Sequence, residues 1–323
     1  MSDSKNSLAK LRNYYRDDFI NYLFVERNLS SRTLKEYGHD LKIFFDYFEP
    51  HLNEELTLDT IDERTIREFL TYLRIKLKYS AKGVNRKLAS LKSYFHFLKK
   101  EGYILKSPVE EVKGAKLEKH LPKVLDEDDV AHLIEVAESV SDLKSELEYD
   151  GDDNYKKFVY VRDYAIMELF YASGMRISEL TGLDIGDIDF KSNMIKVTGK
   201  GNKQRVVLIN EACASAIYMY LSVRPEVKTN ALFLNRNKTR LSVRAVQIMF
   251  RKTMLRAGIA KNASPHTMRH SFATHLLKGG SDLVTIKELL GHENLATTQI
   301  YTNITMQHIQ ETYNKSHPRA GDN

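Results

Sequence analysis

Cysteine is almost absent from this chain of 323 residues, which contains only Cys213. An internal disulfide and a cysteine-based metal cluster are therefore excluded. Because Cys213 lies in the apolar run 212–217, we expect a buried and unreactive thiol. Apolar runs long enough to span a membrane are also absent, and residues 1–6 lack the hydrophobic region of a signal peptide. We therefore expect a cytoplasmic protein without a membrane partner.

Acidic residues are missing from two long segments. Residues 71–100 contain nine Lys or Arg and residues 236–256 contain seven, with no Asp or Glu in either. A charge run usually marks a solvated helix face, but such faces normally mix both signs. One sign over this length is typical of contact with phosphates, and the net charge of +6 agrees. We therefore expect double-stranded DNA as partner. The candidate phosphate contacts are Lys82, Arg86, Lys87 and Arg244.

The first third of the chain is predicted to be helical. Apolar positions recur at helical spacing in four segments, and Thr60–Glu63 has the form of a capping box that opens the third. These segments are 9–28, 32–48, 60–73 and 80–100. Four helices with short connections predict a helical DNA-binding domain over residues 1–112. Residues 113–124 are basic, contain Gly and Pro and lack an apolar period, so we expect a linker there.

The remainder, residues 125–323, is predicted to be an α+β domain, which makes the fold mainly α with one small antiparallel β-sheet. Three strand-like segments support the sheet, and the apolar piece 231–235 also resembles a strand. The three segments are 185–190, 194–198 and 205–209. The acidic stretch 141–154 is expected to be an exposed loop, and we assign it no role. No internal repeat is evident.

A histidine and an arginine follow a strong helix start near the end of the chain. Residues 264–265 (Ser-Pro) are typical of an N-cap and the first helical position. His266 and Arg269, three residues apart, share one face near the positive end of the helix dipole, which suits a phosphate. Tyr301 comes nine residues after His292. A phenol beside a phosphate clamp suggests a nucleophile for a phosphodiester.

Cleavage of a phosphodiester without a metal needs a charge clamp, a nucleophile and an acid for the leaving oxygen. Arg176 and Arg269 both stand at helix starts, and a guanidinium fork matches two phosphate oxygens. Lys200 lies on a glycine-flanked hairpin tip, from which an ammonium group can protonate the leaving 5′ oxygen. His266 and His292 can donate hydrogen bonds or carry the proton of the nucleophile.

Each of these residues also has a structural interpretation. A lone arginine is usually a surface residue, a glycine-flanked lysine usually marks a turn, and most of the 18 tyrosines are packing residues. His266 and His270 stand four apart but lack the glutamate of a zinc-hydrolase motif, so we expect no metal and no other cofactor. His270 and His275 are expected to be structural. The functional interpretation depends on the whole set in its order.

The set resembles the catalytic residues of the tyrosine recombinases (integrases). The matching pieces are Gly174-Met-Arg-Ile-Ser-Glu-Leu180, Gly199-Lys-Gly-Asn-Lys203, His266-Thr-Met-Arg269, Leu290-Gly-His292 and Tyr301. The resemblance implies that Tyr301 forms a 3′-phosphotyrosyl bond, while Arg176 and Arg269 hold the phosphate and Lys200 is the general acid. It also implies that His266 and His292 support proton transfer and that Glu179 orients its neighbours. Neither metal nor ATP is needed, because the phosphotyrosyl bond conserves the energy of the phosphodiester bond that was cut.

The family pattern further implies a tetramer on two duplexes that exchanges strands through a Holliday junction. Residues 307–313 are expected to dock on a neighbouring protomer. The ending 316–320 (Ser-His-Pro-Arg-Ala) resembles the Xer-type recombinases, which resolve chromosome or plasmid dimers for partition at cell division. That resemblance raises a paralogous recombinase and a septal DNA translocase as further partners.

Other functions stay open at this point. An integrase or transposase of a mobile element has the same chemistry, although the helix expected from residue 9 leaves no room for an arm-binding domain. A type IB topoisomerase uses the same nucleophile, but the extension after Tyr301 favours an enzyme that assembles with other protomers. A non-catalytic DNA-binding protein on this fold would lack catalytic residues, and all six are present.

Overall fold

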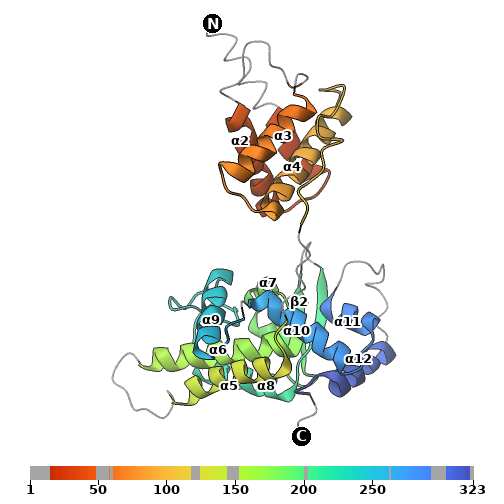
Figure 1. Ribbon diagram of the computed structural model, residues 1–323. Helices are drawn as coiled ribbons and strands as arrows, with labels where there is room; N and C mark the ends of the chain where they lie inside the picture. Colours follow the sequence, from red (N-terminus) through yellow and green to blue (C-terminus); the bar gives the residue numbers. More distant parts are fainter. Residues whose placement is uncertain are drawn as a thin grey trace. The chain divides into compact units, whose positions relative to one another are not determined.

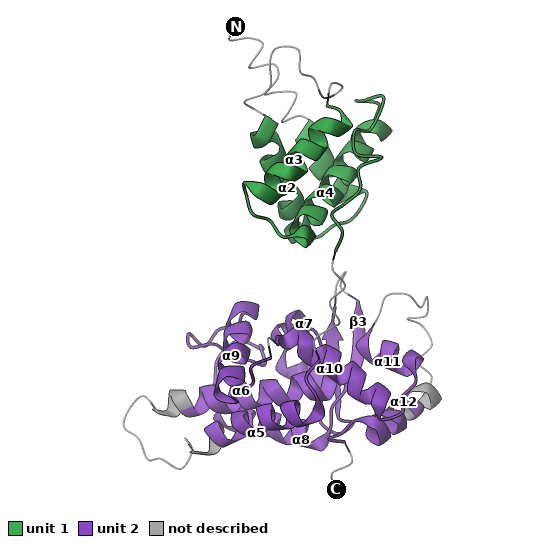
Figure 2. Ribbon diagram, in the orientation of Figure 1, with its two compact units in different colours: residues 1–120 green, residues 121–323 purple. Residues whose placement is uncertain are grey.

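The computed structural model describes residues 15–48, 58, 61–117, 124–143, 153–199, 203–261, 263–291 and 303–320. The chain divides into two compact units, residues 1–120 and 121–323 (Figures 1 and 2). The first is helical, and the second combines helices with one small antiparallel sheet, so the predicted fold class is confirmed. None of the helices in the described ranges is long and apolar enough to cross a membrane.

Unit 1 consists of helical residues 15–25 followed by α2 (Ser31–Phe48), α3 (Glu63–Ile75) and α4 (Ala81–Lys100). Ser80 caps α4 through a hydrogen bond from the backbone N–H of Gly83. The helix start predicted at Thr60 is wrong by two residues, because Asp62 caps α3 and accepts from the N–H of Thr65 at 2.8 Å. A carboxylate followed by an acid in the first turn is a stronger helix start than a threonine two residues earlier.

Unit 1 contains an internal repeat, which corrects the expectation that there is none. Residues 15–48 and 65–98 form the same helix–turn–helix, offset by 50 positions, and the turns share one burial pattern over 21–30 and 71–80. Both turns pass through a left-handed residue, at φ 46° for Asn28 and 54° for Lys78. The identical pairs are Phe19/Phe69, Tyr22/Tyr72, Leu23/Leu73, Ser30/Ser80, Leu41/Leu91, Lys42/Lys92 and Phe45/Phe95. Apart from the exposed pair Lys42/Lys92, they fall at core and turn positions, too sparsely to stand out in the sequence.

The aromatic core shows that the two halves are related by an approximate two-fold axis. Three pairs of ring contacts recur with the halves exchanged. The ring centroids of Phe44–Phe95 and of the equivalent pair Phe45–Tyr94 are both 5.9 Å apart. Those of Phe19–Tyr94 are 5.3 Å apart, and those of the equivalent pair Phe44–Phe69 are 5.2 Å apart. Those of Tyr22–Phe97 are 5.1 Å apart, and those of the equivalent pair Tyr47–Tyr72 are 4.6 Å apart. Such reciprocity is the signature of a two-fold interface.

A buried ion cluster joins the two halves at equivalent positions, 40 and 90. Asp40 is fully buried and accepts hydrogen bonds from Ser90 Oγ at 2.7 Å and from Lys87 Nζ at 2.8 Å. Arg86 donates both terminal nitrogens to the same carboxylate at 2.8 Å. Because the Lys87 side chain is only 2% exposed, the structure contradicts its prediction as a phosphate contact. Its charge neutralises Asp40.

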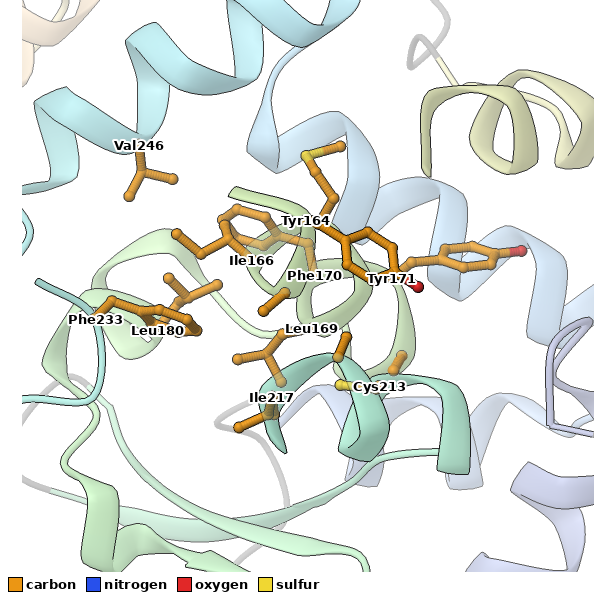
Figure 3. Close-up of a cluster of buried hydrophobic side chains, with 14 of the residues drawn as sticks. Tyr164, Ile166, Leu169, Phe170, Tyr171, Leu180, Cys213, Ile217, Phe233 and Val246 are labelled. Carbon is orange, nitrogen blue, oxygen red and sulfur yellow. The ribbon is translucent and has the colours of Figure 1, made fainter. Parts of the chain in front are cut away.

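Unit 2 is built around α6, which packs against α5, α8 and α10. Its elements are α5 (Glu127–Leu143), α6 (Asp153–Ser173), α7 (Ile177–Gly182), β1 (Ile188–Asp189), β2 (Met194–Thr198), β3 (Gln204–Leu208), α8 (Glu211–Val223), α9 (Val243–Arg256), α10 (Pro265–Lys278), α11 (Leu283–Leu290) and α12 (Asn303–Ser316). The strands form an antiparallel sheet in the order β1-β2-β3. Figure 3 shows Leu169 and Phe170 of α6 among side chains that include Cys213 and Ile217 of α8. The predicted burial of Cys213 is confirmed.

Three predicted segments differ from the structure. Helices α5 and α6 cover 141–143 and 153–154, so the loop expected over 141–154 is shorter, and residues 144–152 lie outside the described ranges. The strand expected over 185–190 is shortened to β1, because residues 185–187 form a 3-10 turn in which Asp187 folds back to accept from the Asp184 N–H at 2.8 Å. The apolar piece 231–235 makes only isolated bridges.

The last helix packs within its own unit, whereas residues 307–313 were expected to dock on a neighbour. Ile309 and Tyr313 are buried in a cluster with Phe272, Leu276 and Ile286, and the Tyr313 hydroxyl donates to Ala172 O at 2.9 Å. The tail is fixed as well. Its contacts are Arg319 to Glu168 at 2.7 Å, His317 Nε2 to Tyr171 O at 3.1 Å and Asn210 Nδ2 to Arg319 O at 2.9 Å. Removing this segment would uncover the core of unit 2.

Candidate active site

The structure describes three of the six predicted catalytic residues. Arg176 and Arg269 lie in one cluster, and His266 lies on the same helix as Arg269. The other three predicted residues lie outside the described residues, although each has a described neighbour in sequence. These residues are Lys200, which follows Gly199, His292, which follows Gly291, and Tyr301, two residues before α12 begins.

Arg176 is the N-cap of α7 and is held by a residue of that helix. Its backbone N–H donates to Glu179 Oε2 at 2.7 Å, and its Nη1 donates to Glu179 Oε1 at 2.8 Å. Burial would raise the pKa of Glu179, but hydrogen bonds from Arg205 and Arg176 outweigh burial, and the pKa is lowered. The carboxylate therefore stays ionised. The Arg176 side chain is still 41% exposed and can meet a ligand.

Arg269 is buried and connects two loops that carry predicted catalytic residues. Ser264 caps α10 and Pro265 occupies its first position, as predicted, which places Arg269 in the second turn. Its Nη1 donates to Gly174 O and its Nη2 to Leu290 O, both at 2.6 Å. The same guanidinium thus touches the turn before Arg176 and the helix end before His292.

A third arginine, Arg205, completes the cluster and was missed in the sequence. Arg205 lies on β3 and donates to both oxygens of Glu179, at 2.6 and 2.9 Å. Only 12% of its side chain is exposed. Strand alternation carried a signal, because Arg205 lies two residues before the buried Val207 and so faces the same side. Its partner on α7 is 26 residues away in sequence, and no local pattern predicts that pairing.

Positive charge exceeds negative charge in this cluster. The described part of the cluster holds three guanidinium groups, Arg176, Arg205 and Arg269, and one carboxylate, Glu179. Burial, with the charges of Arg176 and Arg205, lowers the pKa of Arg269 to about 10. Like charges in a half-buried site favour the binding of an anion, and guanidinium groups match phosphate geometry. The described cluster is therefore suited to the binding of an anion.

The histidines of α10 divide into exposed and structural ones. His266 is exposed in the first turn, with its ring 4.6 Å from that of His270. His275 is buried, donates from Nε2 to Leu125 O at 3.0 Å and accepts from the Tyr171 hydroxyl at 2.9 Å. The structural role predicted for His275 is therefore confirmed. Among the described side chains, no group of three or more His, Cys, Asp or Glu is arranged to hold a metal.

The other predicted DNA contacts lie on helix surfaces. Lys82 is exposed in the first turn of α4, and Arg244 is exposed in the first turn of α9. Arg86 is 47% exposed, but its charge is shared with Asp40 and, at 3.4 Å, with Glu36. Lys82 and Arg244 are therefore accessible to DNA, whereas Arg86 mainly stabilises the fold by binding Asp40.

Comparison with known proteins places the chain in a family. Residues 123–308 match the phage integrase family, and residues 17–102 match the phage integrase N-terminal SAM-like domain. Tyrosine recombinase XerC of Thermodesulfovibrio yellowstonii is 37% identical, covering 94% of this chain and 96% of that protein. Tyrosine recombinase XerD of Staphylococcus epidermidis is 36% identical, with coverage of 94% and 98%.

A solved structure agrees with these relatives. The XerH site-specific recombinase, in a post-cleavage complex with a palindromic difH substrate, has a TM-score of 0.67 and 25% identity, covering 88% of this chain and 80% of that one. Both units are matched by family models, and the relatives are similar over nearly their full lengths. The chain belongs to the phage integrase family of tyrosine recombinases.

Proposed function

We propose that this protein is a site-specific DNA recombinase that cuts and rejoins strands through a 3′-phosphotyrosyl intermediate on Tyr301. The observation that carries the proposal is the arginine cluster, which has more positive charge than its one carboxylate neutralises. A scissile phosphate supplies the missing negative charge. The match to the phage integrase family supports the same chemistry.

In the proposed reaction, the Tyr301 oxygen attacks the phosphorus and the bond from phosphorus to the 5′ oxygen breaks. Lys200 gives its proton to that leaving oxygen, and His266 and His292 support proton transfer from the phenol. Arg176 and Arg269 stabilise the non-bridging oxygens as charge develops on them. Attack by the free 5′-hydroxyl reverses these steps on a new partner, so the reaction uses neither ATP nor metal.

Unit 1 is proposed to be the DNA-binding domain, and its repeat supplies an internal comparison. Residues 21–48 contain four basic and four acidic residues, whereas the matching residues 71–98 contain seven basic and no acidic ones. Of these seven, Arg86 and Lys87 bond the buried Asp40 and so serve the fold. We assign the exposed remainder to DNA phosphates, with Lys82 as a contact there and Arg244 as a contact on unit 2.

The names of the relatives support a particular biological role. XerC and XerD proteins are the relatives compared above, and XerH has been solved on a difH substrate. We propose resolution of chromosome or plasmid dimers by a tetramer on two duplexes, through a Holliday junction, in the cytoplasm. A paralogous recombinase and a septal DNA translocase are proposed partners. Integration of a mobile element by the same chemistry is the second candidate, and the integrase match favours it.

The proposal is tested with a nicked suicide DNA substrate carrying a candidate dimer-resolution site. Wild type, Tyr301→Phe and the control Tyr218→Phe, which alters an exposed tyrosine (55%) on α8, are compared. We expect a covalent protein–DNA adduct with wild type and Tyr218→Phe and none with Tyr301→Phe. An adduct in Tyr301→Phe would refute the nucleophile. Bound but uncleaved DNA with all three proteins would favour a non-catalytic DNA-binding protein.

A further inference from the structure

We propose that Arg205 is a positioning residue of the active site, which neutralises Glu179 so that the charge of Arg176 stays available to a phosphate, holds Arg176 in place through that carboxylate, and supports the segment that leads to His292. The inference rests on the proposed function. It assigns to Arg205 a role distinct from the roles of the six predicted catalytic residues, because its contacts are made to their neighbours.

The first argument is electrostatic. Glu179 is almost fully buried, with 1% of its side chain exposed, and Arg176 and Arg205 share its Oε1. Arg205 binds the carboxylate with both terminal nitrogens, so it provides most of the neutralisation. Arg176, which contributes one terminal nitrogen, keeps positive charge for a phosphate. Without Arg205, Arg176 would be the one remaining side-chain cation on this carboxylate in the described structure, and the excess charge of the cluster would fall.

The second argument is steric. Gly291 ends α11 in the left-handed conformation, at φ 64°, and a Cβ there would stand 2.5 Å from Arg205 Cδ and 2.8 Å from its Nε. The stem of Arg205 therefore lies directly against the backbone that leads to His292. A Cβ on Gly199, the residue before Lys200, would lie 3.4 Å from Glu179 Oε1. The ion pair of Glu179 and Arg205 thus lies beside the residues that precede His292 and Lys200.

The third argument concerns an unused donor. The Nε–H of Arg205 is buried and has no hydrogen-bond acceptor among the described residues. A buried donor without a partner is costly, and each such group in a native structure calls for an explanation. The position of Nε against Gly291 places this donor at the cluster, and an acceptor delivered by the assembled complex would satisfy it.

The first test separates positioning from folding. Arg205→Ala, Arg205→Lys and the control Arg224→Ala, which removes an arginine bonded to loop carbonyls at the end of α8, are compared with wild type. DNA affinity and the single-turnover cleavage rate of bound complex are measured separately. We expect unchanged affinity and cleavage slowed by roughly 100-fold in Arg205→Ala, the scale of loss when a catalytic group is misplaced by about 1 Å. Arg205→Lys should recover only part of the rate, because an ammonium lacks the fork. Arg224→Ala should cleave at the wild-type rate.

A chemical rescue makes the result specific. Methylguanidinium added to Arg205→Ala should raise its cleavage rate at least about tenfold, whereas methylammonium at equal concentration should not, because only the guanidinium fork fits both oxygens. Cleavage by Arg205→Ala at the wild-type rate would overturn the inference, and so would equal rescue by both cations. If wild type itself forms no adduct, the proposed function fails instead.

A second pair of variants tests the steric contact even if Arg205→Ala fails to fold. Gly291→Ala and Gly258→Ala place the same methyl group at helix ends with nearly equal φ, 64° and 63°, but only Gly291 has atoms within 4 Å. Both variants pay the same backbone strain. We expect cleavage to fall at least about tenfold further in Gly291→Ala than in Gly258→Ala, because the contact moves Arg205. Equal rates would overturn the steric part of the inference.

Discussion

Replacing Asp40 by asparagine should destabilise unit 1 strongly. The change leaves the Lys87 ammonium, 2% exposed and 2.8 Å from the lost charge, without its buried partner. Breaking a buried ion pair from one side costs about 3–5 kcal/mol. Arg86 adds little to this cost, because it is half exposed and can turn to water. A domain of this size is stable by roughly 5–15 kcal/mol, so the variant loses a large share of its free energy of unfolding.

A second substitution should reverse most of this loss. In Asp40→Asn/Lys87→Met no charge stays buried, and we expect stability within about 1–2 kcal/mol of wild type, a recovery of roughly 1–4 kcal/mol relative to Asp40→Asn. The control is Asp46→Asn, whose exposed pair with Lys42 contributes less than about 0.5 kcal/mol.

Hydrogen exchange by mass spectrometry measures these changes locally. Amides of α2 and α4 report the free energy of opening of unit 1, and those of α6 provide an internal reference in unit 2. The reasoning is refuted if Asp40→Asn behaves like Asp46→Asn. It is refuted as well if adding Lys87→Met deepens the loss instead of restoring stability.

Two further predictions concern the tail of unit 2. Burial lowers the pKa of His317 to about 4, below its ordinary 6.5, so the unfolded chain takes up the proton first. Stability from this group is complete above pH 6.5 and is lost as pH falls toward 4, by about 2 kcal/mol at pH 5. The free energy of unfolding from urea denaturation should therefore fall between pH 8 and pH 5 by about 2 kcal/mol less in His317→Gln than in wild type. An equal fall in both proteins would contradict the assignment. Gly279→Ala would drive a methyl group into the Ser316 carbonyl, whereas Gly186→Ala meets no atom within 4 Å. We expect a loss of about 1–3 kcal/mol and faster proteolysis of the tail in Gly279→Ala only, and equal behaviour of the two variants would show that the tail is loosely held.

The sequence predicted features whose cause is local. Ser80 and Ser264 each accept a hydrogen bond from the backbone of the next turn, and each marks a helix start found in the structure. The apolar setting of Cys213 likewise predicted its burial. Such signals lie within a few residues of the feature they determine.

Long-range pairings were not predictable in this way. The burial of Lys87 depends on Asp40, 47 residues earlier, and the role of Arg205 depends on Glu179 on another element. A charged side chain looks the same in sequence whether it faces water or a buried partner. Basic composition alone therefore overcounted phosphate contacts in α4 and missed the third arginine of the cluster.

The two-fold repeat in unit 1 affects which side chains can meet at its axis. In a dimer of identical hairpins, the residue at position 40 would face its own copy, and a buried aspartate there would meet a second buried aspartate. Covalent fusion of two hairpins removes that restriction. Asp40 now faces Ser90, and the neighbouring Lys87, whose equivalent in the first half is Tyr37, supplies the counter-charge. Joining the halves in one chain thus permits an asymmetric ion pair that a self-associating hairpin could not contain.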